Sequence, residues 1–354
     1  MSRFFSSQHK ELVPYTPGEQ PTGRQFIKLN TNESPFPPSE KAVAFAAEAA
    51  KQLELYPDPT CSALHRAFAA NCGVSPEQIL MTNGSDEILH FAFLAFCDAR
   101  HPAAFADITY GFYSVFAKLC HVPYTLIPLR EDFTIDPEEY VGLGKTIFLA
   151  NPNAPTGLAL PIESVERIVC GNPNNVVVVD EAYVDFGAKS AVTLINQYDN
   201  LLVTQTFSKS RSMAGARLGC GIACKELIAD LNTIKYSTNP YNINRMTMAA
   251  GLGVLEDEDY TRKNCRKIME TRLFTTQALR QLGFTVIDSM TNFVFAKADW
   301  IGGQALYAAL KERGILVRHF ETPRLRDYNR ITIGTTDQMK SLILAIEECR
   351  EALK

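Results

Sequence analysis

Apolar and polar positions follow two different periods along the chain. From Pro38 to about Lys235, short apolar runs of strand length are separated by longer stretches with helical spacing. The expected strands are 103–108, 125–128, 146–150, 176–179, 201–206 and 218–223. The expected helices are 41–55, 63–72, 86–97, 113–120 and 162–170. This alternation predicts an α/β fold with a mostly parallel sheet covered by helices, in which ligands bind beyond the carboxyl ends of the strands.

The pattern changes after Pro240. A long helix, an apolar run, a second helix, two short strands and a last helix are expected at 257–282, 285–296, 304–313, 315–319, 330–333 and from 337. We therefore predict a large domain at 36–245 and a smaller α+β domain at 246–354. The segment from Glu11 to Pro38 is rich in Pro, Asn, Thr and Gly, so residues 1–35 are predicted to form an extended arm that packs with the small domain.

Length and charge narrow the class of protein. The chain has 354 residues, of which 46% are hydrophobic, and this is enough for a large core and a smaller one. The net charge of -4 is spread along the sequence, which argues against nucleic acid or an anionic membrane as the main partner. No apolar run approaches the roughly 20 residues of a membrane span, and the N-terminus has no apolar signal segment.

Cysteine and histidine usage adds two expectations. The nine cysteines are scattered without a CxxC pair, as is typical of reduced thiols in a reducing compartment, so we expect a cytoplasmic protein. The six histidines show no HExxH or similar ligand spacing, so we expect no metal site.

Two polar segments border predicted strands or helices. NGSDEIL (83–89) places a glycine and small polar residues ahead of a helix, whose free N–H groups suit a phosphate; the alternative is an N-cap formed by Ser85 or Asp86. VVVVDEAYVDF (176–186) is a buried strand that ends in acids. Asp180 could pair with a cationic ring nitrogen and Tyr183 could donate to a phenolate oxygen, whereas Glu181 is expected to be a solvated loop residue.

A third segment, TFSKSRSMAGARLG (206–219), follows another predicted strand. It combines the hydroxyls of Thr206 and Ser208 with Lys209 and Arg217. A lysine close to other cations has its neutral amine favoured, which suits imine chemistry, although a lone Ser-Lys pair is usually a surface feature.

The order of these segments resembles that of fold-type-I pyridoxal-phosphate aminotransferases, and NPNAPTG (151–157) is similar to the NPxNPTG segment of those enzymes. Within them the chain is similar to histidinol-phosphate aminotransferases over essentially its whole length. The further segments that carry this resemblance are LVPYTPGEQP (12–21), LNTNESPFPPS (29–39), LYPDPT (55–60), TYGFY (109–113), GILVR (314–318) and RITIGT (330–335).

The resemblance implies a role for each matching residue. Lys209 would hold pyridoxal 5'-phosphate as a Schiff base and move the proton between substrate carbon and cofactor. Asp180 would keep the pyridine nitrogen protonated, and Tyr183 would hydrogen-bond the phenolate oxygen. Tyr110 would stack on the ring, with Tyr113 as packing. The cofactor phosphate would be held by Ser85, Asp86, Thr206, Ser208 and Arg217, and by Tyr56 of the other subunit.

One position departs from the family pattern. Ala154 stands where family members usually carry an asparagine that meets the phenolate oxygen. Either Asn151 or Asn153 replaces that amide, with Asn151 preferred, or Tyr183 and the imine alone balance the oxygen.

The implied reaction is a transamination that interconverts histidinol phosphate and 2-oxoglutarate with imidazole-acetol phosphate and glutamate, in a homodimer with shared active sites. Arg318 and Arg330 would bind the anionic groups of the substrate, because two guanidinium groups suit a phosphate, unless Arg318 pairs with Glu321 at the surface. Tyr15 and Asn292 would complete the substrate pocket. The alternatives are a threonine-phosphate decarboxylase, an aromatic aminotransferase, or a cofactor-binding module without turnover.

Overall fold

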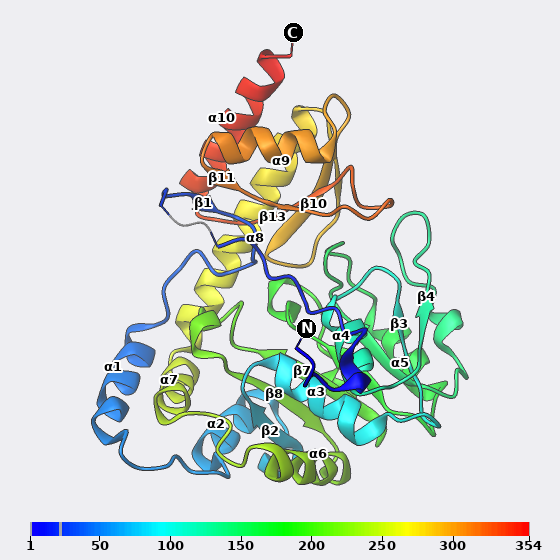
Figure 1. The fold of residues 1–354 in the computed structure, drawn as a ribbon. Coiled ribbons are helices and arrows are strands. Elements are labelled where there is room, and N and C mark those ends of the chain that lie inside the picture. Colours follow the sequence, from blue (N-terminus) through cyan, green and yellow to red (C-terminus); the bar gives the residue numbers. More distant parts are fainter. Residues whose placement is uncertain (1, 21–22, 354) are drawn as a thin grey trace.

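A seven-stranded sheet lies at the centre of the larger part of the protein (Figure 1). The structure is a computed structural model and describes residues 2–20 and 23–353. The strands lie in the order β2-β8-β7-β6-β5-β3-β4. Strand β8 runs antiparallel to β2 and β7, and the other neighbours are parallel. The bounds are β2 Ile79–Thr82, β3 Ala103–Ala106, β4 Tyr124–Ile127, β5 Thr146–Ala150, β6 Val177–Asp180, β7 Leu201–Thr206 and β8 Gly219–Ala223.

Helices cover both faces of this sheet, so its central strands are apolar on both sides. In β5, Ile147 and Leu149 join one hydrophobic cluster while Phe148 and Ala150 join another. The first cluster contains residues of α1 (Glu40–Ala49), α2 (Ser62–Cys72), α5 (Ile162–Cys170) and α7 (Arg245–Leu255). The second contains residues of α3 (Ser85–Phe96), α4 (Phe112–Leu119) and α6 (Lys225–Thr238). The predicted α/β fold with a mostly parallel, covered sheet is confirmed.

The C-terminal part is built on a four-stranded antiparallel sheet in the order β12-β13-β10-β9. Its strands and helices are α8 (Glu258–Gln281), β9 (Phe284–Ile287), β10 (Phe293–Ala298), α9 (Gly303–Glu312), β12 (Arg318–His319), β13 (Asn329–Thr332) and α10 (Thr336–Glu351). The apolar run predicted at 285–296 is therefore a pair of strands joined by a turn. Helix α7 packs on α1 and in the first cluster, although the predicted boundary assigned residues 246–255 to the second domain.

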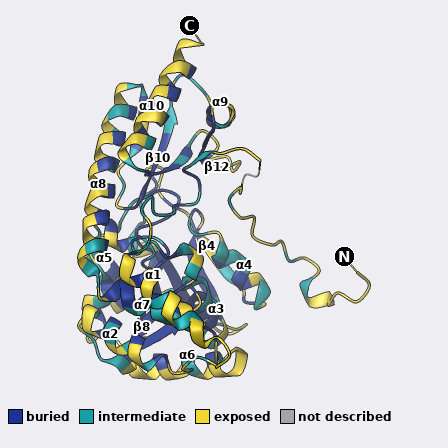
Figure 2. Ribbon diagram, turned by 90° about the vertical axis from the view of Figure 1, so that its left-hand side faces the viewer, coloured by how far each residue is buried: buried dark blue, intermediate teal, exposed yellow. Residues whose placement is uncertain are grey.

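The N-terminal arm contacts both parts of the molecule. Strand β1 (Ile27–Lys28) pairs in parallel with β11 (Ile315–Leu316), which ties the arm to the C-terminal part. Further towards the N-terminus the described arm is mostly exposed (Figure 2). It reaches the larger part there, since the Tyr15 ring stacks on Phe112 with centroids 4.3 Å apart. In the described part of the chain, none of the helices has the length and apolarity that a membrane span requires.

Candidate active site

Two connected cavities lie where the central parallel strands end. The first, of about 340 Å³, is lined at the ends of β5, β6 and β7 by Ala150, Asp180 and Thr206. The second, of about 650 Å³, reaches Arg318 and Arg330 of the C-terminal part. Both cavities are lined by Thr31, Tyr110, Ala154, Tyr183 and Lys209. The site therefore occupies the edge at which a parallel sheet binds its ligands.

Lys209 lies on the loop that follows β7. Its Nζ donates to the carbonyl of Thr31 at 3.3 Å and lies 5.9 Å from the centroid of the Tyr183 ring. The base of the loop is closed by backbone hydrogen bonds from Phe207 to Leu218 and from Met213 to Phe207. The amine is thus held at the junction of the two cavities by a short, closed loop.

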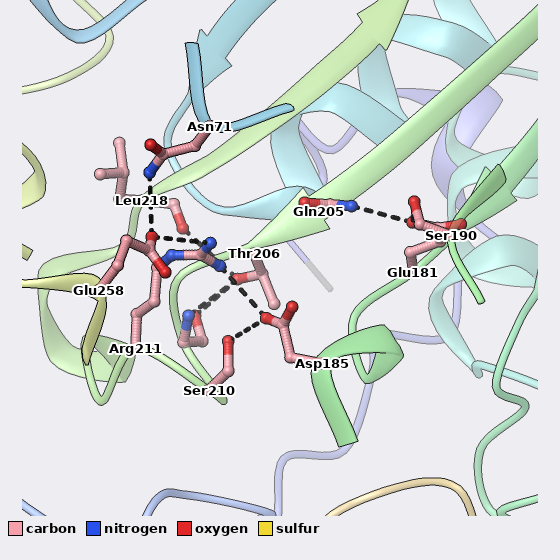
Figure 3. A network of polar contacts seen from close by, with 11 residues as sticks. Asn71, Glu181, Asp185, Ser190, Gln205, Thr206, Ser210, Arg211, Leu218 and Glu258 are labelled. Carbon is pink, nitrogen blue, oxygen red and sulfur yellow. Dashed lines mark hydrogen bonds and ion pairs between the residues drawn. The ribbon is translucent and has the colours of Figure 1, made fainter. Parts of the chain in front are cut away.

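The residues after Lys209 belong to a polar network on the other side of the same loop (Figure 3). Ser210 donates to Asp185. The Arg211 guanidinium pairs with Asp185 at 3.2 Å and with Glu258 at 3.4 Å, and it lies over the Phe207 ring, 4.9 Å from the centroid. The side chain of Arg211 is only 9% exposed. These contacts fix the loop from behind and connect it to the start of α8.

Asp180 is buried at the end of β6. Its carboxylate accepts hydrogen bonds from the hydroxyls of Tyr113 at 2.8 Å and Thr204 at 3.3 Å. Burial raises the pKa of Asp180 to about 6, and the Tyr113 hydrogen bond opposes that rise. Both of these partners are neutral, so a cationic ligand group in the cavity would supply the counter-charge. Tyr113 was predicted to be packing, and its contact with Asp180 was missed.

The start of α3 has the features of an anion seat. Gly84 has φ +77°, and a Cβ there would lie 2.6 Å from Arg217 Nη2. This close approach brings Arg217 to Asp86 at 3.0 Å, beside the free N–H groups of the first helical turn. Ser85, Asp86 and Arg217, which the sequence analysis assigned to the cofactor phosphate, all line the first cavity.

Hydroxyl groups complete this seat. Thr206 donates to Ser208 at 2.9 Å, and both hydroxyls line the first cavity. Tyr110 donates to Asp86 at 2.7 Å, so its ring is fixed on the wall that the two cavities share. A guanidinium, hydroxyls and helical N–H groups at one end of a cavity suit a phosphate group.

The opposite end carries two arginines around one aromatic ring. The guanidinium groups of Arg318 and Arg330 each lie 5.8 Å from the centroid of Phe320. Arg318 donates to the carbonyls of the arm at Thr16 and Pro17, at 3.5 and 3.4 Å, rather than pairing with Glu321. Tyr15 lines the same cavity.

Arg330 and a third arginine hold this end in place. Arg330 donates to the carbonyl of Asn30 at 3.0 Å, and burial lowers its pKa. Arg324 also lines the second cavity and was not predicted. It pairs with Asp107 at 3.4 Å and donates to the carbonyls of Leu129 and Arg130, which fastens a loop of the C-terminal part to the larger part.

Comparison with known proteins identifies the family. The family model described as aminotransferase class I and II matches residues 24–346. The histidinol-phosphate aminotransferase of Marinomonas sp. (strain MWYL1) is 48% identical over 351 residues, which cover 98% of this chain and 99% of the relative. The chain belongs to the histidinol-phosphate aminotransferases of this family. The corresponding enzyme of Brachyspira hyodysenteriae (strain ATCC 49526 / WA1) is 46% identical over 98% of this chain and 99% of its own length.

Solved structures show the same fold. The histidinol-phosphate aminotransferase of Sinorhizobium meliloti, determined in complex with pyridoxal-5'-phosphate, matches with a TM-score of 0.89 at 24% identity, over 100% of this chain and 99% of that one. The L-threonine-O-3-phosphate decarboxylase of Porphyromonas gingivalis matches with a TM-score of 0.80 at 22% identity, over 92% and 99% of the two chains. The fold-type-I assignment is thus confirmed, but the fold alone does not separate these two reactions.

Three predicted site residues lie outside the two cavities of this chain, as described by the residues that line them. Neither Asn151 nor Asn292 is among the described residues that line the two cavities. Asn151 Oδ1 accepts from the backbone N–H of Leu160 at 2.8 Å, and Asn151 Nδ2 donates to the Leu160 carbonyl at 3.1 Å. Asn151 therefore does not replace the asparagine side chain that is absent at Ala154. Asn292 is fully buried and donates to the carbonyl of Asn32 at 3.0 Å. Tyr56 is 78% exposed and stacks on Tyr241 outside the cavities of its own chain.

Glu181 was expected to be solvated, and this expectation was wrong. It is 2% exposed and accepts a hydrogen bond from the backbone N–H of Ala191. It also accepts hydrogen bonds from Ser190 and Gln205, which are drawn in Figure 3. Burial raises its pKa to about 7. Glu181 thus follows the apolar run of β6 as a buried residue, and its carboxylate lies on the side of the sheet away from the cavity.

Asn32 is a residue near the candidate reaction centre that the sequence did not single out. Its Nδ2 donates to the hydroxyl of Tyr183 at 2.9 Å. In the sequence, Asn32 lies within LNTNESP, a segment that is similar to the family but to which the resemblance assigned no function.

Proposed function

We propose that the protein is a pyridoxal-phosphate transaminase that interconverts histidinol phosphate and 2-oxoglutarate with imidazole-acetol phosphate and glutamate. The observation that carries this proposal is the arrangement along the connected cavities. An anion seat at Arg217 lies at one end, Asp180 and Lys209 lie between, and Arg318 and Arg330 lie at the other end. The 42–48% identity to histidinol-phosphate aminotransferases supports the choice of substrate.

The residues present fit the cofactor. Asp180 is a buried carboxylate whose hydrogen-bond donors are neutral hydroxyls, so it matches a cationic ring nitrogen. Arg217 and the hydroxyls of Ser85, Thr206 and Ser208 match the cofactor phosphate. When bound, pyridoxal phosphate supplies an aldehyde for imine formation and a ring that accepts electrons from the substrate carbon.

Each side chain that lines the cavities is assigned a separate role in the reaction. Asp180 holds a proton on the ring nitrogen, and a cation beside it would lower its pKa from the raised value that burial gives. With its amine, Lys209 would take the proton from the α-carbon of the substrate and return it to the carbon that the cofactor aldehyde supplies, two atoms away. Tyr110 and Tyr183 line both cavities, and we assign them to the ring face and to its phenolate oxygen.

The substrate phosphate is assigned to Arg318 and Arg330. A phosphate carries nearly two negative charges at neutral pH, and two guanidinium groups around Phe320 match it better than one. Tyr15 adds a neutral donor from the arm.

The deciding experiment compares Arg318→Ala with wild type on two substrates. We expect kcat/KM for histidinol phosphate to fall by the equivalent of about 2–4 kcal/mol, as for the loss of a desolvated charge pair, and kcat/KM for glutamate to fall much less. Arg326→Ala in the same loop is the control, because this residue is exposed. Equal losses for both substrates would contradict the phosphate assignment, and parallel assays with threonine phosphate and phenylalanine test the rival reactions.

We further propose a cytoplasmic homodimer with shared sites. Tyr56 lies among exposed apolar side chains that a second copy would cover. These are Val43, Leu53, Leu55, Tyr56, Tyr236, Tyr241 and Met246. In the dimer, Tyr56 is assigned to the cofactor phosphate of the partner.

Mixing two impaired variants tests this sharing. Lys209→Ala and Tyr56→Phe subunits, once exchanged, would form heterodimers in which one site carries both lesions and the other carries neither. Activity should therefore rise above that of either parent. Confirmed exchange with no regained activity would count against shared sites.

A further inference from the structure

Asn32 connects the C-terminal sheet to the hydroxyl of Tyr183. It lies between β1 and α1, is 1% exposed and has φ +56°, a conformation that asparagine tolerates better than most residues. Its Nδ2 donates to Tyr183 Oη at 2.9 Å, and its carbonyl accepts from Asn292 Nδ2 at 3.0 Å. The segment is therefore fixed both at its backbone and at its side chain.

Thr332 on β13 sets the orientation of the Asn32 amide. The backbone N–H of Asn32 donates to Thr332 Oγ1 at 3.0 Å, so the proton of that hydroxyl is free to donate to Asn32 Oδ1, also at 3.0 Å. A reversed amide would place its NH₂ group against Thr332 and its oxygen against Tyr183. The direction found in the structure keeps the hydrogen bond that Thr332 donates to Asn32 Oδ1, and in this direction Asn32 is a donor towards Tyr183.

This orientation determines where the Tyr183 proton goes. A tyrosine hydroxyl has one proton and accepts through its lone pairs. Because Asn32 occupies an acceptor position, the Tyr183 proton stays available for donation into the cavity beside Lys209. Ala154 contributes only a methyl group to the same cavity, and the amides of Asn151 and Asn153 are bonded elsewhere. The direction of the Tyr183 hydroxyl therefore matters more here than in a site with an amide at that position.

We propose that Asn32, held by Thr332, is a positioning residue that keeps the Tyr183 hydroxyl as a donor to the phenolate oxygen of the bound cofactor. The inference rests on the proposed function and deepens it. In this chain, the Tyr183 hydroxyl directed by Asn32 would compensate for the hydrogen-bond donor that is absent at Ala154.

The test is a pH titration of the visible absorption of the reconstituted holoenzyme, without substrate. A donor to an anionic oxygen stabilises the deprotonated form of the Lys209–cofactor linkage, so loss of the donor raises the spectral midpoint. Asn32→Asp replaces the donor by an acceptor and should raise the midpoint by about one pH unit. Thr332→Val frees the amide to turn and should raise it by less. If Asn32→Asp fails to fold, Thr332→Val gives the same test.

The Tyr183→Phe background separates positioning from a general structural effect. If Asn32 acts through Tyr183, the uncharged Thr332→Val change should shift the midpoint in wild type and cause no further shift when combined with Tyr183→Phe. Asn32→Asp is not used in this comparison, because its added charge would raise the midpoint directly. Equal shifts in both backgrounds would overturn the inference, as would unchanged midpoints for Asn32→Asp and Thr332→Val. A wild-type protein without a visible, titrating band would overturn the proposed function together with this inference.

Discussion

The two sides of the loop after β7 differ in how fully their polar groups are paired. On the cavity side, the Lys209 amine has one hydrogen bond within the described residues, to the carbonyl of Thr31. On the other side, Ser210 and Arg211 form hydrogen bonds and ion pairs with Asp185 and Glu258 (Figure 3). A reactive amine must be free to exchange partners, whereas its position must not change. The loop meets both needs by placing its rigid contacts behind the reactive group.

Two consecutive residues at the end of the neighbouring strand β6 show the same difference between the cavity side and the far side. Asp180 faces the cavity and is bonded by the hydroxyls of Tyr113 and Thr204. Glu181 faces away and accepts from three donors. Cavity-facing groups are thus left for a ligand to complete. Far-side groups are mostly paired by the protein itself, although the buried Arg211 Nε has no hydrogen-bond partner among the described residues. The predictions below test this contrast.

The largest effect is expected for Lys209→Ala. We expect multiple-turnover transamination to fall by about 10⁴-fold or more, because imine exchange and proton transfer both lose their group. The unfolding free energy should change by less than about 1 kcal/mol, since the amine has few contacts. Steady-state assays and urea unfolding check both statements, with the exposed Lys189→Ala as control. Sustained turnover without an added amine would remove Lys209 from the proposed role.

The next effect is expected for Asp180→Asn. Neutralising this carboxylate should leave the ring nitrogen largely unprotonated and slow the glutamate half-reaction by about two orders of magnitude or more. Glu181→Gln is the matched control, because it makes the same change one residue on and away from the cavity. Stopped-flow absorbance measures both variants. Similar rates for the two would indicate that the cavity-facing acid has no special role.

Arg211→Met should affect stability on the far side of the loop. It leaves Asp185 and Glu258 without their shared cation, and the unfolding free energy should fall by about 2 kcal/mol, less than for a fully buried pair because both acids are partly exposed. Urea unfolding of the cofactor-free protein measures this loss. Arg262→Met, which breaks an exposed pair with Asp259, should have little effect. Equal losses in the two variants would mean that the network does not stabilise the loop.

The sequence predicted the parts of this site that lie close together along the chain. Segment 206–219 identified Thr206, Ser208, Lys209 and Arg217, and all four line the first cavity. Alternating apolar runs likewise predicted the central strands. These features follow from local order, because a strand end and the loop after it stay together whatever the rest of the fold does.

Contacts between distant segments could not be predicted in the same way. Tyr113 reaches Asp180 from helix α4, and Asn32 reaches Tyr183 from the segment between β1 and α1. Asn151 looked equivalent to a cavity amide in the sequence, but its side chain turns to Leu160. The sequence favours a solvated Glu181 because acidic residues are usually exposed, and three donors from later segments make its burial possible. Each case depends on the tertiary partner, which residue type and spacing do not specify.

The smallest expected effect is a pH dependence of stability caused by Glu181. Three donors favour its ionised form, but burial outweighs them and raises its pKa to about 7 from 4.5. The folded protein therefore holds a proton that the unfolded chain has released above pH 4.5, so this stabilising contribution is lost as the pH rises through 7. Between pH 6 and pH 8 the loss should be about 1 kcal/mol.

Glu181→Gln should remove this part of the pH dependence, because its side chain does not titrate. Urea unfolding of the cofactor-free protein at pH 6 and pH 8 measures the difference, and the exposed Glu163→Gln should keep the wild-type slope. An unchanged slope in Glu181→Gln would mean that its three donors keep Glu181 ionised across this range. The buried acid behind the sheet would then be compensated by neutral donors alone, and its contrast with Asp180 would lie in the number of those donors.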